Sequence, residues 1–189
     1  MEPSHEEKSI LLEAARNSIK SFFNGQKIEV PDYNKHPLLK SRSGAFVTLT
    51  QKGRLRGCIG HIISDQPVFE TVCEVALHAA RSDPRFSPVN QEELPKIEIE
   101  ISILSEPFPL KSYDEIEIGK HGLILEEKGR RGLLLPQVPV EHHMDKEQYL
   151  DAICQKSGFH ASYWRDKQLN LNGFTATVFS EKSIKEEVV

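Results

Sequence analysis

The sequence has few of the residues that build disulfide, metal or membrane-anchoring sites. Its 189 residues include only three cysteines, Cys58, Cys73 and Cys154, which are widely spaced. This excludes a disulfide framework and a CxxC zinc site, and we expect three reduced thiols. No apolar run approaches the length of a membrane-spanning helix, and the first residues lack the basic and apolar regions of a secretory signal. We therefore expect a cytoplasmic globular protein without a membrane partner.

The chain also has fewer basic residues than acidic ones. The chain carries 24 lysines and arginines against 28 acidic residues, which gives a net charge of −4 at pH 7. That balance argues against broad electrostatic binding to nucleic acid, although it leaves room for a local basic patch. The sequence also lacks a glycine-rich phosphate loop and a serine nucleophile elbow. We expect no metal site, and no motif points to a cofactor.

Helical and strand patterns are mixed along the chain, without a regular βαβ alternation. Helices are predicted from the Ser4–Glu7 capping box to Phe23, over 67–81 and over 145–157. Strands are predicted at 45–50 and 54–59, at 96–104, on either side of Lys128-Gly129, and in the last strand "GFTATVFS". This mixture predicts an α+β fold with a mainly antiparallel sheet and packed helices.

The stretch "GRLRGCIG", residues 53–60, places a thiol among glycines and arginines. Alternation along a strand directs Leu55 and Ile59 toward the core, and Arg54, Arg56 and Cys58 toward the other face. A guanidinium close to a thiol favours the thiolate, so a reactive Cys58 is one hypothesis. The other is a small residue that simply fills space, which is the better explanation for the two remaining cysteines.

The glycines of this stretch, Gly57 and Gly60, leave room for a ligand or for another backbone. The strand "IEIEISIL" places Glu98 and Glu100 opposite a row of isoleucines. If this strand lay beside 54–59, the two carboxylates would meet the arginines across the sheet. Glu100 is also a candidate proton carrier, although a solvated sheet face is the usual explanation for such alternation.

Two further segments carry candidate ligand-binding residues. In "SDPRF", Asp83 can accept hydrogen bonds from local amides, and Arg85 can present a planar fork to a carboxylate or phosphate. In "LLPQV", Gln137 can read the hydrogen-bonding edge of a ligand, or can cap a turn.

Six motifs in one order resemble the AMMECR domain family. They are "GAFVTL", "LRGCIG", "DPRFSPV", "IEISILS", "GLLLPQV" and "GFTATVF", and with them the resemblance covers nearly the whole chain. It implies one domain over 8–182, with tails at 1–7 and 183–189. It also implies larger and smaller α+β subdomains that meet at a cleft beside the "LRGCIG" strand. Met144 stands where the family usually has a tryptophan.

The resemblance also suggests where the protein acts. Similar microbial domains are encoded beside or fused to Memo-like and radical SAM proteins, which implies a shared modification pathway acting on RNA, a nucleotide or a small molecule. Two functions stay open. In the first, Arg56 and Arg85 bind an anionic ligand beside a reactive Cys58, with Glu100 as proton carrier. In the second, the same residues form a non-catalytic peptide- or nucleic-acid-binding module, or an adaptor for a partner enzyme.

Overall fold

The computed structural model describes residues 2–186, which form two compact units. The first unit runs to Leu104 and resumes at Thr177, and the second comprises Ser105–Ala176. Each unit has its own sheet and its own hydrophobic core. Helices with two antiparallel sheets confirm the predicted α+β class.

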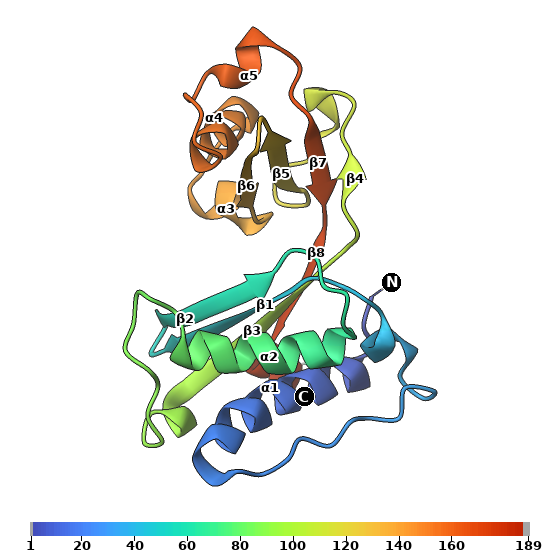
Figure 1. Cartoon of the computed structure of the whole chain (residues 1–189), viewed down its shortest axis with the longest axis vertical. Helices are drawn as coiled ribbons and strands as arrows, with labels where there is room; N and C mark the ends of the chain where they lie inside the picture. The colour runs from blue at the N-terminus through green and yellow to red at the C-terminus, as the bar shows by residue number, and fades with distance from the viewer. Residues whose placement is uncertain (1, 187–189) are drawn as a thin grey trace. The chain divides into compact units, whose positions relative to one another are not determined.

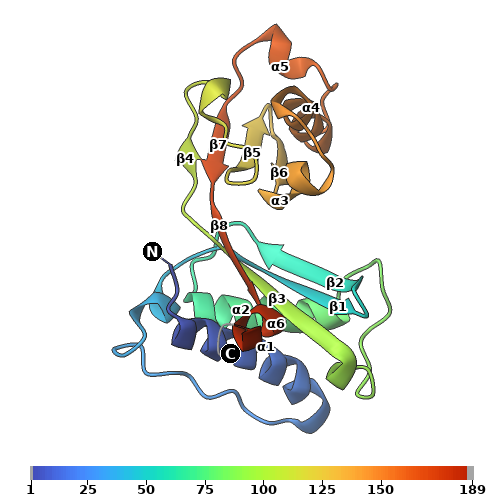
Figure 2. The ribbon, with the colours of Figure 1, turned by 180° about the vertical axis from the view of Figure 1, so that it is seen from behind.

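The first unit is a four-stranded sheet with helices on one face (Figures 1 and 2). The strand order is β2-β1-β3-β8. The longer elements are α1 (His5–Asn24), β1 (Ala45–Gln51), β2 (Arg54–His61), α2 (Val68–Arg81), β3 (Ile97–Leu104), β8 (Ala176–Ser180) and α6 (Glu181–Glu186). Short 3₁₀ turns lie at Pro37–Lys40 and Leu94–Lys96. The predicted first hairpin and the helix ending at Arg81 are therefore confirmed.

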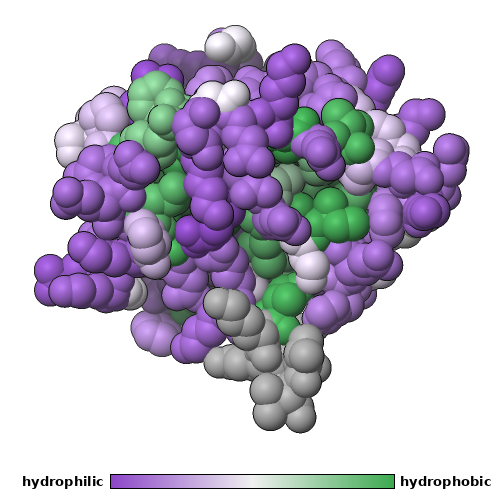
Figure 3. Space-filling model, turned by 90° about the horizontal axis from the view of Figure 1, so that it is seen from below, coloured by the Kyte–Doolittle hydropathy of each residue, from purple (hydrophilic) through white to green (hydrophobic). Residues whose placement is uncertain are grey.

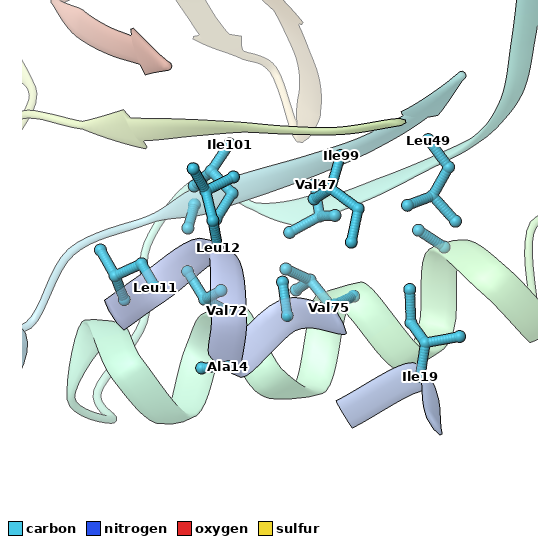
Figure 4. Close-up of a cluster of buried hydrophobic side chains, with 14 of the residues drawn as sticks. Leu11, Leu12, Ala14, Ile19, Val47, Leu49, Val72, Val75, Ile99 and Ile101 are labelled. Atoms are coloured by element: carbon cyan, nitrogen blue, oxygen red, sulfur yellow. The ribbon is translucent and has the colours of Figure 1, made fainter. Parts of the chain in front are cut away.

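The core of the first unit lies between the sheet and the two long helices (Figure 4). The alternate isoleucines of β3 are buried, as the sequence predicts, and they meet side chains from α1 and α2. The residues labelled in Figure 4 are Leu11, Leu12, Ala14, Ile19, Val47, Leu49, Val72, Val75, Ile99 and Ile101. On the α1 side of the molecule, hydrophilic residues cover most of the surface (Figure 3).

Helical structure extends into both of the segments expected as tails. Helix α1 begins at His5, because Ser4 and Glu7 form the predicted capping box, and Glu7 is buried. At the other end, Glu181 begins α6 and pairs with Arg16 at 2.5 Å. The same carboxylate accepts the backbone N–H of Ile99 at 3.0 Å. The segment therefore packs on the first unit, while residues 187–189 of the expected tail lie outside the described part.

The second unit has a sheet of its own, in the order β4-β7-β5-β6. Its elements are β4 (Phe108–Pro109), a 3₁₀ turn at Tyr113–Glu115, β5 (Gly122–Glu127), β6 (Arg130–Leu134), α3 (Gln137–Glu141), α4 (Lys146–Lys156), α5 (Tyr163–Asp166) and β7 (Leu171–Phe174). The hairpin around Lys128-Gly129 and the helix predicted over 145–157 are confirmed. Helix α4 buries Tyr149, Leu150 and Ile153 in the core of this unit.

The predicted last strand is wrong in one respect. The segment "GFTATVFS" is divided between β7, in the second sheet, and β8, in the first, with only Thr175 between them. Alternation of side chains continues through such a break, so a period-2 pattern cannot reveal that a strand changes its sheet.

Gly57 lies where the backbone of β2 passes close to the backbone of α2. A Cβ placed there would lie 2.2 Å from the carbonyl oxygen of Ala79, which belongs to the α2 backbone and cannot rotate away. The glycine therefore sets the spacing between strand and helix.

We expect Gly57→Ala to lower the free energy of unfolding by about 2–3 kcal/mol, because overpacking forces the helix off the sheet. The control is Gly129→Ala, at a turn glycine with φ 73° and open space around it, where only about 1 kcal/mol of backbone strain is expected. Urea unfolding of both variants measures the difference. Equal losses would show that α2 does not approach β2 as described.

Candidate functional site

Strand β2 forms one edge of the first sheet, and the segment after α2 covers part of that edge. The backbone N–H of Cys58 donates to Oδ2 of Asp83 at 2.9 Å, and its carbonyl accepts from Nη2 of Arg85 at 3.4 Å. Two side chains thus take the place of a neighbouring strand. This explains the "DPRF" segment, since an unprotected edge invites pairing with other chains.

Asp83 is the buried centre of this arrangement. Only 2% of its side chain is exposed, and its carboxylate accepts Nε and Nη2 of Arg85 at 2.9 and 2.7 Å. The backbone N–H of Arg85 donates to the same carboxylate at 3.1 Å. These hydrogen bonds, first those of the Arg85 side chain and then the backbone amides of Cys58 and Arg85, lower the pKa of Asp83 against the opposing effect of burial.

Arg85 is held at one side and open at the other. Its side chain is 55% exposed, although Asp83 fixes two of its nitrogens. Nη1 has no hydrogen-bond partner among residues 2–186. The pKa of Arg85 is raised, chiefly by its hydrogen bonds to Asp83 and, to a smaller degree, by the charges of Asp83 and Cys58. Arg85 is therefore the arginine whose guanidinium contacts Cys58, through the carbonyl of that residue.

The thiol of Cys58 lies on the sheet face opposite the helices and is half-buried. Because the N–H and C=O of Cys58 point to the sheet edge, its pair with Thr48 has the closer of the two antiparallel spacings. The Thr48 hydroxyl donates to Sγ at 3.3 Å. Thr48 is also paired with Glu100 on its other side. Cys58, Thr48 and Glu100 therefore form one row across three strands, with about 10 Å between the outer two backbones.

Arg56 belongs to a different set of contacts. The register of β1 and β2 shifts between Leu49 and Thr50, which leaves Arg56 as the extra residue of a bulge. Its guanidinium donates to both oxygens of Glu93, at 2.9 and 3.1 Å, and to the carbonyl of Ser87 at 2.9 Å. These hydrogen bonds from Arg56 are the main cause of the lowered pKa of Glu93. Arg56 therefore positions the segment that follows Asp83 and Arg85.

Strand order corrects the expectation that these arginines meet the carboxylates of β3. Strand β1 lies between β2 and β3, so Glu98 and Glu100 are not neighbours of Arg54 and Arg56. Arg54 is exposed at the start of β2. The bulge also corrects the predicted core position of Leu55, which is 43% exposed.

Gly60 leaves space for a ring and not for a ligand. A Cβ at this position would lie 2.3 Å from Cγ of Phe46, so the phenylalanine packs directly over the glycine. The two glycines on either side of Cys58 thus serve packing on opposite faces of β2.

Gln137 is the first residue of α3 and belongs to the second unit. The hydrogen bonds that join Cys58, Asp83 and Arg85 do not involve it. In the same unit, Met144 packs against the hydrophobic core, so it fills apolar volume in the place of the family tryptophan.

Within residues 2–186, no group of three or more histidine, cysteine, aspartate or glutamate side chains is arranged so that it could hold a metal ion. In the same range, no helix has both the length and the apolar character that crossing a bilayer requires.

Two residues of the site were not predicted from the sequence. Thr48 contacts the thiol, and Glu93 binds Arg56. Glu93 exchanges backbone-to-side-chain hydrogen bonds with Asn90 in both directions, at 3.0 and 2.9 Å. The spacing of a polar residue and a glutamate three positions later is a local signal for such an exchange. No local signal marks Thr48, because its contact depends on strand register.

The site lies within the part of the chain that a family model matches. A model of the AMMECR1 family matches residues 12–179, a span that contains every residue of the site just described. The chain belongs to the AMMECR1 family.

Its relatives are similar along almost their full length. Protein Mbar_A1807 of Methanosarcina barkeri is 39% identical over 183 residues, which cover 93% of this chain and 90% of the relative. A protein of Thermococcus gammatolerans is also 39% identical, over 91% of this chain and 89% of its own. The crystal structure of the uncharacterized protein PH0010 from Pyrococcus horikoshii has a TM-score of 0.81 and 35% identity, covering 93% of this chain and 91% of that one. The similarity to these relatives supports the fold and the family membership of this chain, and the names of the relatives state no activity.

The three thiols should differ in reactivity. Burial, followed by the charge of Glu70, raises the pKa of Cys73 to about 12, and burial also raises the pKa of Cys154. At pH 8 we expect iodoacetamide to label Cys58 well before the other two, as measured by mass spectrometry of tryptic peptides. Labelling of Cys73 or Cys154 at the same rate in the folded protein would contradict this.

The lowered pKa of Asp83 predicts a pH-dependent contribution to stability. A carboxyl whose folded pKa is depressed stabilises the protein above its unfolded pKa, about 3.9, and loses that effect as the pH falls. Asp83→Asn should lower the free energy of unfolding by about 2 kcal/mol at pH 7, and the difference from wild type should narrow below about pH 4.

Denaturant unfolding at several pH values checks this, with the exposed Asp65→Asn as the matched control. A difference between Asp83→Asn and wild type that stays constant from pH 7 to pH 3 would exclude an ionised, stabilising Asp83.

Proposed function

We propose that the first unit binds an anionic group of a ligand at Arg85, beside the thiol of Cys58. The observation that carries this proposal is the state of the Arg85 side chain, which is fixed by a buried carboxylate and still 55% exposed. A guanidinium that is already oriented loses little conformational freedom when it binds a phosphate or carboxylate. The bonds to Asp83 supply that orientation.

Arg56 and Asp83 have supporting roles in this proposal. Arg56 is only 13% exposed and is engaged with Glu93 and two carbonyls, so it positions the binding segment and does not contact the ligand. Asp83 aligns Arg85 in the same way. The binding surface is therefore built by Arg85, the Cys58 thiol and the groups around them.

A catalytic function is the second candidate, favoured by the placement of the thiol. Cys58 is half-buried, accepts a hydrogen bond from Thr48, and shares a row with Glu100. Strand β1 separates the strands of Cys58 and Glu100, and the side chain that contacts the thiol is that of Thr48 from β1. For this reason the binding function is the stronger of the two.

The finer assignments also belong to this proposal. They are a place in a modification pathway with Memo-like and radical SAM partners, a nucleotide, RNA or small-molecule ligand, a contribution from Gln137, and a cytoplasmic location. Their support is the family resemblance and the ordinary globular composition.

Loss of Arg85 should remove anion binding. We expect Arg85→Ala to weaken binding of inorganic phosphate at least tenfold, because charge-assisted hydrogen bonds contribute about 1.5–3 kcal/mol each. Arg85→Lys should also bind more weakly, since an ammonium does not reproduce the fork. The measurement is the shift of the Arg85 Nε–H resonance in wild type, and of the Cys58 amide in each variant, during phosphate titration.

The matched control is Arg42→Ala, at an exposed arginine elsewhere in the first unit. Thermal unfolding of each variant establishes that it is folded. Unchanged phosphate affinity in a folded Arg85→Ala protein would refute the proposed binding site.

A further inference from the structure

A pocket of about 360 Å³ in the second unit combines aromatic and cationic side chains. It is lined by Lys128, Arg130, Gly158, Phe159, His160 and Tyr163. Lys128 is the first residue of the β5–β6 turn and Arg130 is the first residue of β6, and the other residues follow α4 and extend into α5. Helix α4 lies beside both β6 and α5 in this unit (Figure 1). None of these residues belongs to the Arg85 site.

The aromatic part of the pocket is a fixed stack. The rings of Phe159 and Tyr163 are nearly parallel, with 4.4 Å between centroids and 5° between planes. Tyr163 is 9% exposed, and its hydroxyl donates to Oε1 of Glu127 at 3.3 Å. His160 meets the Tyr163 ring edge-on, at 5.5 Å between centroids. Packing and hydrogen bonding therefore hold the rings in place before any ligand arrives.

Two cations lie over these rings. The guanidinium carbon of Arg130 is 4.9 Å from the centroid of Phe159, and Nζ of Lys128 is 5.6 Å from that of Tyr163. Arg130 also donates to the carbonyl of Gly158, which fixes its plane. The turn that brings the cations together has Lys128 at φ 49° and Gly129 at φ 73°, the left-handed pair typical of a two-residue hairpin.

The charge of these cations is not balanced by nearby acids. Among the described residues, neither Lys128 nor Arg130 forms an ion pair with a carboxylate. The pocket lining contains two cations and no carboxylate. Of the acids next to it, Glu127 pairs with Lys167, and Oδ2 of Asp166 lies 3.3 Å from Nε2 of His160. The pocket therefore carries surplus positive charge beside a planar stack.

We propose that this pocket binds one nucleotide of a single-stranded nucleic acid. A nucleotide supplies both complements: an anionic phosphate for Lys128 and Arg130, and a planar base that stacks on the outer face of the Arg130 guanidinium, which itself lies over Phe159. Inorganic phosphate would leave the rings unused, and a duplex buries its base faces. The volume is at the lower end of the range for ligand pockets, which suits a single unit of the strand.

The test uses fluorescence anisotropy of a labelled single-stranded ten-nucleotide oligouridylate with the full chain. Arg130→Ala should weaken binding about tenfold, and Phe159→Leu at least fivefold, because Phe159 supports the guanidinium on which the base stacks. The matched control is Arg131→Ala, at the next residue of β6, whose exposed guanidinium lies 3.8 Å from Glu126 and does not line the pocket. This control should change affinity less than twofold, and wild-type affinity should fall with added salt.

Several outcomes would overturn the proposal. Equal losses in Arg130→Ala and Arg131→Ala would show diffuse surface charge in place of a pocket. Unchanged affinity in Phe159→Leu, or equal competition by inorganic phosphate and by AMP, would exclude a base contact. Equal binding of a matched duplex would exclude the single-strand assignment.

Two further variants make the result independent of folding and of the Arg85 proposal. Circular dichroism reports whether each variant is folded. If Phe159→Leu is not folded, Lys128→Ala and the competition by AMP and inorganic phosphate decide whether the pocket binds a nucleotide. Arg85→Ala should bind the oligonucleotide as wild type does. If Arg85 proves not to bind phosphate, the test of the pocket in the second unit is therefore unaffected. If the pocket proves not to bind a nucleotide, the test of Arg85 is likewise unaffected.

Discussion

The buried carboxylate of Asp83 is the interaction on which the candidate site depends. It lies two residues beyond the end of α2 and accepts a hydrogen bond from the backbone of β2, so it joins the helix terminus to the sheet edge. The same oxygens hold the guanidinium of Arg85. This one carboxylate therefore protects an edge strand, orients the Arg85 guanidinium and fixes the segment that follows α2. A buried charge is tolerated here only because the backbone N–H of Cys58 and the Arg85 donors are all present.

Most of the "LRGCIG" segment is accounted for by packing around that interaction. Gly57 admits the backbone of α2, Gly60 admits the ring of Phe46, and Arg56 anchors the segment that follows Asp83. Two groups at the sheet edge are not explained by packing, namely the half-buried thiol of Cys58 and the half-exposed guanidinium of Arg85. A cluster of unusual residues in a sequence can therefore be mainly a construction device, with the functional groups occupying only a part of it.

The sequence predicts those parts of the fold that depend on local periodicity and capping. Helix α1 follows from its capping box, β3 from alternate isoleucines, and the Lys128-Gly129 hairpin from its turn residues. The order of strands is different, because β1 intervenes between β2 and β3 through contacts that no local pattern encodes. The same distinction applies to the site. Asp83 and Arg85 are two positions apart, so a local pattern can indicate their hydrogen bonds. Arg56 and Glu93 are 37 positions apart, so no local pattern indicates their contact.

The change of sheet at Thr175 makes the second unit an insertion within the first. The strands on either side of this insertion, β3 and β8, are neighbours in the first sheet. The ends of the insertion meet, since the N–H of Ser105 donates to the carbonyl of Thr175 at 2.9 Å and the N–H of Thr175 donates to the Ser105 hydroxyl at 2.9 Å. For the first unit, the inserted segment is equivalent to a long loop of a hairpin. Because the entropy of closing a loop grows only slowly with its length, the inserted segment can lengthen, shorten or change its surface at little thermodynamic cost to the sheet that carries it.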